Sequence, residues 1–374
     1  MDLSLTETQQ LIQDSTRDFV RNDYTKEVLL DLDEMPEPLT KELWTKVSQL
    51  GWMGMAIPEK YGGTGNSLTD VAVLYEELGR GPVPGPSFSS GVLGALTLLN
   101  TASPAHKEAW LPEVASGERI LALAVTEKRY GWSPGHIEMT AKQDGGDYVL
   151  TGTKLFVHDA ASATDLLVLA KTESGLSMLR VDANIPGVSI RVLPGFLSGV
   201  TEVTFDNVKV PGEDLIGTEG AAWASFDAAL RSAIPVLCAY KVGACQALFE
   251  LSVAYSRERT QFGQPIGKFQ RVQDHIIHIV NYLDAARWTT YEALWKLDTG
   301  QDAASSVHMA KVLASDGYLR ACDFTHEVHA GIGVMREYGL TLHTKMSRSL
   351  YHCLGAPKYH RKRMEGALGL TSLR

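Results

Sequence analysis

The chain has 374 residues, of which 44% are hydrophobic and 21% are charged, with 34 Gly and 15 Pro. This is the composition of an ordinary globular protein, and it excludes a mostly disordered chain, a collagen-like chain and a small disulfide-rich scaffold. The formal net charge of -9 argues against nucleic acid as a partner. The length predicts two or three domains, at about 100–200 residues per domain.

The spacing of cysteine and histidine residues, together with the lack of long apolar runs, excludes further kinds of protein. His326, Glu327 and His329 lack the H-E-x-x-H spacing of a zinc site, so we expect no metal centre. No apolar run reaches the roughly 18 residues that a membrane span needs, and the N-terminus lacks the basic and apolar regions of a secretory signal. We therefore expect a cytoplasmic protein with no membrane span. The cysteines have no C-x-x-C spacing and are expected to be free thiols: Cys238, Cys245, Cys322 and Cys353.

Residues 1–118 have helical periodicity and are expected to form an N-terminal α-helical domain. One helix is predicted to be capped at its start by Ser67 or Thr69, and the prolines that follow it, from Pro82 on, forbid its continuation. Its apolar face repeats every three or four residues, as in an amphipathic helix. That face comprises Leu68, Val71, Ala72, Tyr75 and Leu78.

Residues 119–218 change to a period of two, which is typical of strands. Residues 137–141 alternate apolar and polar side chains, residues 144–147 are turn formers, and residues 148–157 return as a strand, so a hairpin is predicted. Further short apolar runs follow at residues 166–170, 176–181 and 203–210. Strands at such spacing predict a central β-domain of the sandwich or barrel type.

Residues 219–374 return to long helical patterns and are expected to form a C-terminal four-helix bundle. The order of helices, then strands, then helices predicts an α+β multidomain protein, because a doubly wound fold would alternate strand and helix. The chain also contains no G-x-G-x-x-G after a strand and no G-x-x-x-x-G-K-[ST]. Rossmann-type and P-loop sites therefore lose their main support.

The segment 257–270 (R-E-R-T-Q-F-G-Q-P-I-G-K-F-Q) is the most distinctive in the chain. We expect one helix to end in a cationic turn there and another to start near Phe269. Arginine in an exposed turn suits a phosphate ligand, because its guanidinium forms paired planar hydrogen bonds. The alternative is a helix C-terminus whose basic residues only interact with the helix dipole. From these residues alone the alternative is favoured.

The whole chain resembles the acyl-CoA dehydrogenase family. Residues 259–263 (R-T-Q-F-G), with Phe269-Gln270, look like the family's R-x-x-F-G…Q segment, and residues 329–333 (H-A-G-I-G) look like its H-G-G-x-G. Residues 125–127 (V-T-E), 152–157 (G-T-K-L-F-V) and 208–211 (V-K-V-P) match motifs of the family's middle domain, in the right order.

The resemblance implies that FAD is held between the β-domain and the bundle, with the 259–263 turn reaching the FAD of a neighbouring subunit. It also implies an acyl-CoA substrate, an electron-transfer acceptor and a homo- or hetero-oligomer with FAD near the subunit interface. By matching position, two groups of residues would bind the cofactor. Thr126, Trp132, Phe156 and His158 would surround the flavin ring, and Arg259, Gln261, Phe262, Gln270, Glu327 and Gly331 would lie along the rest of the dinucleotide.

The reaction of the family removes a proton from the α-carbon of the thioester while a hydride passes from the β-carbon to flavin N5. The base should be a carboxylate in a dry pocket, where desolvation raises its pKa. Glu76 and Glu77 are expected near the end of the acyl tunnel.

The family's base is absent at both of its usual positions. At one position, the branch of the family that this chain most resembles has an acid after the glycine, and here Ala356 follows Gly355. At the other position, on the first bundle helix, the chain has Ala233. Asp227 could serve as the base only if the alignment shifted by nearly two helical turns. The catalytic base is therefore unknown. The loss of a general base typically costs about 10²–10⁴ in rate.

Two further departures from the family pattern point the same way. The second of them resembles a branch that acts on bulky or steroid side-chain thioesters, often with a diverged partner subunit. Glu327 replaces the glutamine of Q-x-x-G-G, and residues 126–134 (T-E-K-R-Y-G-W-S-P) replace the phosphate-side T-E-P-G-x-G-S-D. Three alternatives stay open. The chain desaturates acyl-CoA, it is a non-catalytic subunit of a heteromeric dehydrogenase, or it carries out base-free chemistry such as elimination from a thioester.

Overall fold

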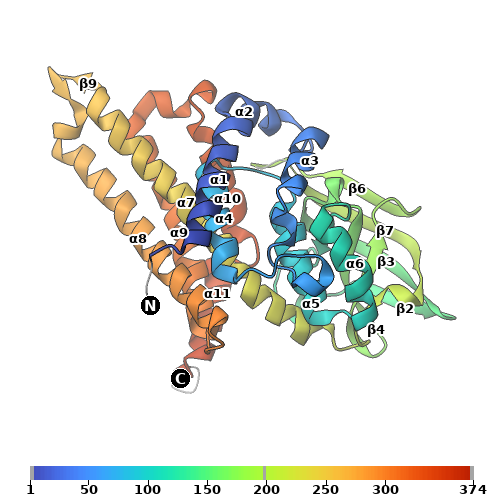
Figure 1. Cartoon of the computed structure of the whole chain (residues 1–374). Coiled ribbons are helices and arrows are strands. Elements are labelled where there is room, and N and C mark those ends of the chain that lie inside the picture. The colour runs from blue at the N-terminus through green and yellow to red at the C-terminus, as the bar shows by residue number, and fades with distance from the viewer. Residues whose placement is uncertain (1–3, 197–198, 371–374) are drawn as a thin grey trace. The chain divides into compact units, whose positions relative to one another are not determined.

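A computed structural model describes residues 4–196 and 199–370 of the chain (Figure 1). The chain divides into two compact units. The bundle unit comprises Met1–Asp33, Ser67–Val83 and Ile234–Arg374, and the sheet unit comprises Glu34–Asn66 and Pro84–Ala233.

The bundle unit consists of helices. Its long helices α8 and α9 pack along each other, and α10 and α11 pack against α9 (Figure 1). Helix α7 enters this unit at Ile234. The helices are α1 (Glu7–Asp23), α2 (Lys26–Glu34), α4 (Leu68–Arg80), α7 (Ala222–Glu258), α8 (Gln270–Asp298), α9 (Ala304–His329), α10 (Leu340–His352) and α11 (Pro357–Ala367), with 3-10 turns at Ile266–Lys268, Ala330–Val334 and Arg336–Tyr338.

Helix α4 begins where its sequence predicts. The Ser67 hydroxyl accepts a hydrogen bond from Asp70 N, and the Asp70 carboxylate accepts one from Ser67 N, which makes a capping box. The backbone N–H groups of Leu68 and Thr69 donate to the carboxylate of Asp298, at the end of α8. A negative charge at the N-terminus of a helix also interacts favourably with the positive end of the helix dipole. Of the two predicted caps, Ser67 is therefore confirmed.

Helices α7 and α8 are joined by a small β-hairpin at the tip of this helix pair, labelled β9 in Figure 1. Strand β9 (Thr260–Gln261) pairs antiparallel with β10 (Gln264–Pro265), and Phe262 and Gly263 form the turn between them. Both turn residues have positive φ, 52° and 76°, as a two-residue type I′ turn requires. The predicted break between two helices is confirmed, although the cationic turn is a hairpin and not only a helix end.

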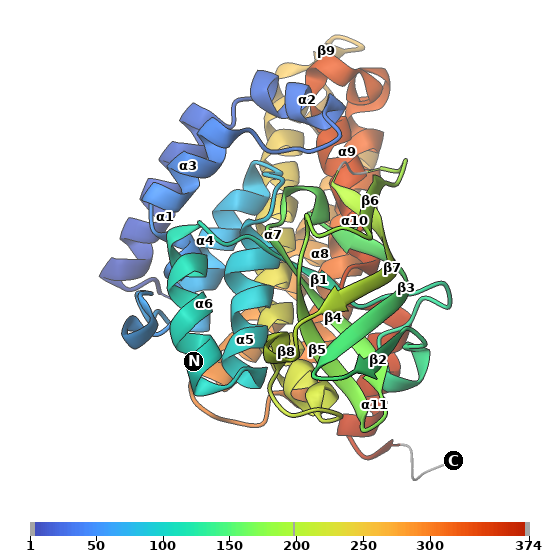
Figure 2. The same cartoon turned by 90° about the vertical axis from the view of Figure 1, so that its right-hand side faces the viewer.

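The sheet unit contains a mixed sheet covered by short helices. Its strand order is β6-β7-β3-β2-β4-β5-β8, with β1 parallel to β4 (Figure 2). The strands are β1 (Leu121–Ala124), β2 (Thr140–Asp144), β3 (Asp147–His158), β4 (Asp165–Thr172), β5 (Gly175–Asp182), β6 (Val188–Val192), β7 (Val200–Val210) and β8 (Leu215–Ile216). The helical elements are α3 (Lys41–Gln49), α5 (Ala95–Thr101), α6 (Pro104–Ser116), a π-helix at Ser87–Gly94, and 3-10 turns at Trp52–Gly54, Glu59–Tyr61, Pro134–His136, Ala160–Ser162 and Gly212–Asp214.

The predicted hairpin is strands β2 and β3, which pair antiparallel from Asp144↔Asp147 to Thr140↔Thr151. Apolar side chains of β3, β4 and β7 form one buried core. Strand β3 contains a bulge, because its pairing with β7 shifts between Lys154 and Val157. A bulge bends a strand and redirects a side chain, and this one lies where Phe156 leaves the regular pleat.

The predicted fold class, with helices, then a sheet, then helices, is confirmed. The cysteines of the described residues are free, as predicted, and three of them are buried. Helix α7 is long and apolar enough to span a membrane by length and composition, although it contains no unbroken apolar run of that length. However, 78% of its most apolar window is buried, as is typical of a core helix in a folded protein.

Candidate functional site

The hairpin turn between α7 and α8 presents an aromatic side chain that is not packed into the core. Phe262 is 91% exposed and has φ of 52°. Its ring meets the ring of Phe269 edge to face, with the centroids 6.0 Å apart. A non-glycine residue in this left-handed conformation costs on the order of 1–3 kcal/mol, and such residues cluster at functional sites. The turn thus holds a large apolar side chain in solvent at an energetic cost.

Hydrogen-bond donors surround this phenylalanine. Arg259, Gln261 and Gln270 are all exposed, and Gln270 is the first residue of α8. The side chain of Arg259 makes no ion pair with any residue in the described part of the chain. A free guanidinium beside amide donors has the chemistry of a phosphate-binding group.

A second strained aromatic pair lies in the sheet unit. Phe156, at the β3 bulge, is 48% exposed and has φ of 55°, and Tyr130 has φ of 32°. Their rings meet edge to face with centroids 5.5 Å apart. The structure therefore holds a half-exposed aromatic surface here, at further cost in backbone strain.

The other residues predicted to face a flavin ring belong to the same unit. Thr126 is buried and its hydroxyl donates to Leu155 O, while Leu155 N donates back to Thr126 O. His158 ends β3 and is half-buried, and Trp132 is half-buried in the segment after the Glu127 turn. Thr126 and Phe156 are thus brought together through one backbone contact.

Glu327 and Gly331 lie near the C-terminal end of α9. Glu327 is exposed, and its charge partly offsets the lowering of the pKa of His275 by burial and by Arg271. A Cβ built on Gly331 meets nothing within 4 Å, so this backbone is open to a ligand. Glu327 and His275 therefore lie close enough to interact electrostatically.

These residues fit FAD by their chemistry. The sheet unit offers a half-exposed aromatic surface suited to a flat apolar ring, and the bundle unit offers Arg259 and amide donors suited to a pyrophosphate. Both surfaces contain aromatic residues in strained left-handed conformations. Among the described residues, no group of three or more His, Cys, Asp or Glu could hold a metal ion.

The two positions where a base was sought carry no acid. Ala233 is completely buried within α7. Ala356 is the N-cap of α11, and it makes no side-chain cap. Asp227 lies 4.0 Å from Arg231 on the same face of α7. The residue that would remove the α-proton is not identified among these three.

Two buried lysines hold the turn that contains Ala356. Lys311 Nζ donates to Gly355 O at 3.1 Å and to Ser315 Oγ at 3.0 Å, and Lys241 Nζ donates to Ser315 Oγ at 2.8 Å and to Leu350 O at 2.9 Å. Burial lowers the pKa of both lysines, and the neighbouring charge of Lys241 lowers that of Lys311 further. The two lysines thus tie the end of α10 and the turn before α11 to helices α7 and α9.

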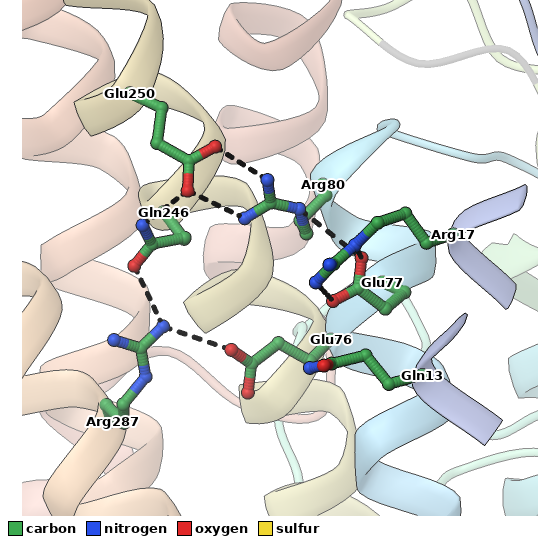
Figure 3. Close-up of a pocket in the computed structure, with 8 residues that line it drawn as sticks. All are labelled: Gln13, Arg17, Glu76, Glu77, Arg80, Gln246, Glu250 and Arg287. Carbon is green, nitrogen blue, oxygen red and sulfur yellow. Dashed lines mark hydrogen bonds and ion pairs between the residues drawn. The ribbon is translucent and has the colours of Figure 1, made fainter. Parts of the chain in front are cut away.

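Glu76 and Glu77, expected near the end of an acyl tunnel, line a polar cavity of about 330 Å³ in the bundle unit (Figure 3). Arg17 and Arg80 both pair with Glu77, at 2.8 and 3.3 Å. Glu76 accepts hydrogen bonds from Arg287 at 3.0 Å and from the Tyr291 hydroxyl at 2.6 Å. Both carboxylates are thus occupied by ion pairs between helices, and their relation to an acyl chain stays a prediction.

Sequence reasoning about the site missed Tyr130 and the role of Lys154. Lys154 is fully buried in β3, two residues before Phe156. The sequence could have indicated this, because Tyr148, Leu150 and Lys154 are separated by even numbers of residues and so face the same, buried side of the strand. A lysine on a buried side needs a partner for its charge. Tyr130 gave no such signal, since only the tertiary structure shows that its ring meets that of Phe156.

Family models match nearly the whole chain. The N-terminal domain of acyl-CoA dehydrogenase matches residues 6–118, the middle domain matches residues 122–208, and the C-terminal domain matches residues 223–368.

Individual proteins agree with the family models. The chain is 31% identical over 353 residues to the "Probable acyl-CoA dehydrogenase YngJ" of Bacillus subtilis, covering 91% of this chain and 92% of that protein. It is 30% identical over 356 residues to the "L-prolyl-[peptidyl-carrier protein] dehydrogenase" of a Serratia strain, covering 92% of each.

Solved structures agree as well. The glutaryl-coenzyme A dehydrogenase complex with glutaryl-CoA has a TM-score of 0.92 at 27% identity, covering 100% of this chain and 98% of that one. The FAD complex of PigA has a TM-score of 0.92 at 27% identity, covering 99% and 100%. One chain of the ChsE4-ChsE5 complex from Mycobacterium tuberculosis has a TM-score of 0.90 at 27% identity, covering 99% of each chain. The chain, with its three matched domains in order and its strained aromatic residues at the predicted cofactor positions, belongs to the acyl-CoA dehydrogenase family.

Proposed function

We propose that this oxidoreductase oxidises an acyl thioester to its α,β-enoyl form, with FAD as its cofactor. FAD is the cofactor of the family, and one of the similar structures is a FAD complex. The observation that carries the proposal is the placement of Phe156 and Phe262. Both are exposed in left-handed conformations, at the positions that resemble the family's contacts with FAD. Exposure and strain together favour a ligand-binding role over a role in folding.

The residues of the chain would bind and orient. Thr126 and Phe156 would hold the flavin ring and keep water from one face of it, and Arg259 with Gln261 would bind the pyrophosphate of a FAD in a neighbouring subunit. The chemistry that FAD supplies when bound is acceptance of a hydride at flavin N5. Hydrogen bonds to the thioester oxygen would stabilise the negative charge that develops there as the α-proton leaves.

A second candidate is a non-catalytic subunit of a heteromeric dehydrogenase. Ala356 and Ala233 favour it, because neither can accept a proton and both stand where an acid is expected. The similarity to a chain of the ChsE4-ChsE5 complex also supports it, since that protein is a complex of two different chains. In this case a partner chain would supply the base. An acyl-CoA substrate, an electron-transfer acceptor and a cytoplasmic location remain part of the proposal in either case.

The deciding experiment is an absorbance spectrum of the purified chain, followed by anaerobic addition of straight-chain, branched and steroid side-chain acyl-CoA. The leading proposal predicts a bound flavin whose absorbance bleaches with at least one of them. Bound flavin that no thioester bleaches supports the second candidate. A protein that binds no FAD contradicts both the cofactor and the reaction.

Two variants sharpen this experiment. Arg259→Ala should lower the amount of bound FAD, since a charge-assisted hydrogen bond is worth about 1.5–3 kcal/mol, or roughly tenfold to a hundredfold in affinity. Lys268→Ala, an exposed change of the same charge a few residues away, is the control and should keep full FAD content. If the second candidate is right, Ala356→Glu should restore bleaching in the isolated chain, because it adds a carboxylate where the related branch has one.

A further inference from the structure

A buried ion pair in the sheet unit lies close in sequence to Tyr130 and Phe156, through Glu127 and Lys154. Lys154 Nζ donates to Glu127 Oε1 at 2.7 Å, to Leu169 O at 2.6 Å and to Val125 O at 3.2 Å. The Lys154 side chain is fully buried and that of Glu127 is 10% exposed. An ammonium group has three donors, and all three are satisfied.

The carboxylate of Glu127 is equally well satisfied. Besides Lys154, it accepts hydrogen bonds from Glu138 N at 2.8 Å and from Met139 N at 3.1 Å. Burial lowers the pKa of Lys154 to about 8, and Glu127 opposes this by favouring the charged amine. The pair therefore joins four segments of the sheet unit: the end of β1, strand β3, strand β4 and the approach to β2.

The residues expected to face the flavin ring are attached to these same segments. Thr126 immediately precedes Glu127, and its backbone carbonyl accepts a hydrogen bond from the N–H of Leu155, the residue between Lys154 and Phe156. Tyr130 N donates to Glu127 O at 2.8 Å, which fixes the turn that carries Tyr130, and the Tyr130 ring meets the ring of Phe156. Loss of the pair would free both sides of the aromatic surface, the Thr126–Tyr130 turn and the β3 bulge.

We propose that Glu127 and Lys154 are positioning residues, which hold Thr126, Tyr130 and Phe156 in the geometry that binds the flavin ring. The inference rests on the proposed function, since it assumes that this surface faces FAD. A buried ion pair contributes little net stability, because desolvation of both charges offsets their attraction. A well-packed apolar pair would stabilise the fold as well. Only a hydrogen-bonded pair can also hold the backbone groups that this pair contacts, at Val125 and Leu169 on one side and at Glu138 and Met139 on the other.

The test measures FAD binding and folding stability separately, in Glu127→Gln, Lys154→Met and the double variant. Each single change leaves a buried charge without its opposite charge, so it should lower the thermal midpoint and raise the FAD dissociation constant about tenfold to a hundredfold. The double change removes both charges, so the thermal midpoint should return toward that of the native chain. FAD should still bind about tenfold or more weakly to the double variant, with an altered flavin circular dichroism spectrum, because the backbone is no longer held.

Asp165→Asn is the matched control in the same unit. Asp165 is buried and pairs with Arg119 and Arg180, at 2.7 Å each, so its loss should cost stability without touching the aromatic surface. FAD should bind this variant within about twofold of the native chain. The inference is overturned if FAD affinity follows the thermal midpoint across all four variants, which would make the pair structural only. A native chain that binds no FAD would instead overturn the proposed function.

Discussion

At the scale of single side chains, two exposed aromatic residues have a left-handed backbone. Phe156 and Phe262 keep exposed aromatic rings in conformations that suit glycine better, and both lie at predicted cofactor positions. Ala330 is also left-handed, with φ of 51° and ψ of -133°, a region that is essentially restricted to glycine. The family motif has glycine at this position, and this chain has alanine.

Ala330→Gly should therefore stabilise the chain. Relief of the backbone strain, about 1–3 kcal/mol, should exceed the entropic cost of a glycine in the unfolded state, about 0.4–1 kcal/mol. We expect a net gain of about 1 kcal/mol, measured as a higher thermal midpoint. Ala304→Gly, in the first turn of α9, is the control and should lower the midpoint. An unchanged or lower midpoint for Ala330→Gly would mean that the alanine is not strained.

At the scale of elements, a close contact between α4 and α7 in the bundle unit depends on two glycines. A Cβ on Gly79 of α4 would lie 1.8 Å from Tyr240 O of α7, and one on Gly243 of α7 would lie 1.7 Å from Glu76 O of α4. These contacts are backbone to backbone, so no side chain can move to relieve them. The crossing of α4 and α7 therefore needs glycine on both helices.

Gly243→Ala should destabilise the chain by about 3 kcal/mol or more, because the two helices must separate to admit one methyl group. Gly366→Ala, on the exposed side of α11 with nothing within 4 Å of its added Cβ, should instead be neutral or slightly stabilising. Thermal unfolding of the two variants beside the native chain makes the comparison. Equal midpoints for the two variants would show that the α4–α7 contact is not close in solution.

At the scale of the whole molecule, buried histidines make the free energy of unfolding depend on pH. Burial lowers the pKa of His343 to about 4, and burial with the charge of Lys311 lowers that of His360 to about 2. Both groups have an ordinary pKa near 6.5 in the unfolded chain. Between these values the unfolded chain binds more protons than the folded one, so stability falls as pH falls below about 6.5.

His343 alone should account for about 3 kcal/mol between pH 6.5 and pH 4, since one pKa unit corresponds to about 1.4 kcal/mol. His343→Gln removes the titrating group and can still accept a hydrogen bond from the Tyr318 hydroxyl, which now lies 3.0 Å from His343 Nδ1. Urea unfolding at pH 7 and pH 5 should show a smaller loss of stability for this variant than for the native chain. His136→Gln, on a partly exposed turn, should behave as the native chain does, and equal losses in all three proteins would contradict this prediction.

The sequence by itself determined the order of helices and strands, the Ser67 cap, the β2–β3 hairpin and the family. Each of these depends on residues close together in the chain: the periodicity of apolar side chains, a capping box, a turn between alternating segments, or a short motif. The missing acids at Ala233 and Ala356 were also visible in the sequence, because they are properties of single positions.

Only the tertiary structure decided which distant residues meet. Lys154 finds its partner Glu127 across three segments, Phe156 is turned outward by a bulge, and Tyr130 reaches it from another loop. Glu77 pairs with two arginines, one from α1 and one from α4, which the sequence did not indicate. Such pairings follow from strand register and helix crossing, which the packing of the whole core sets and no local pattern records.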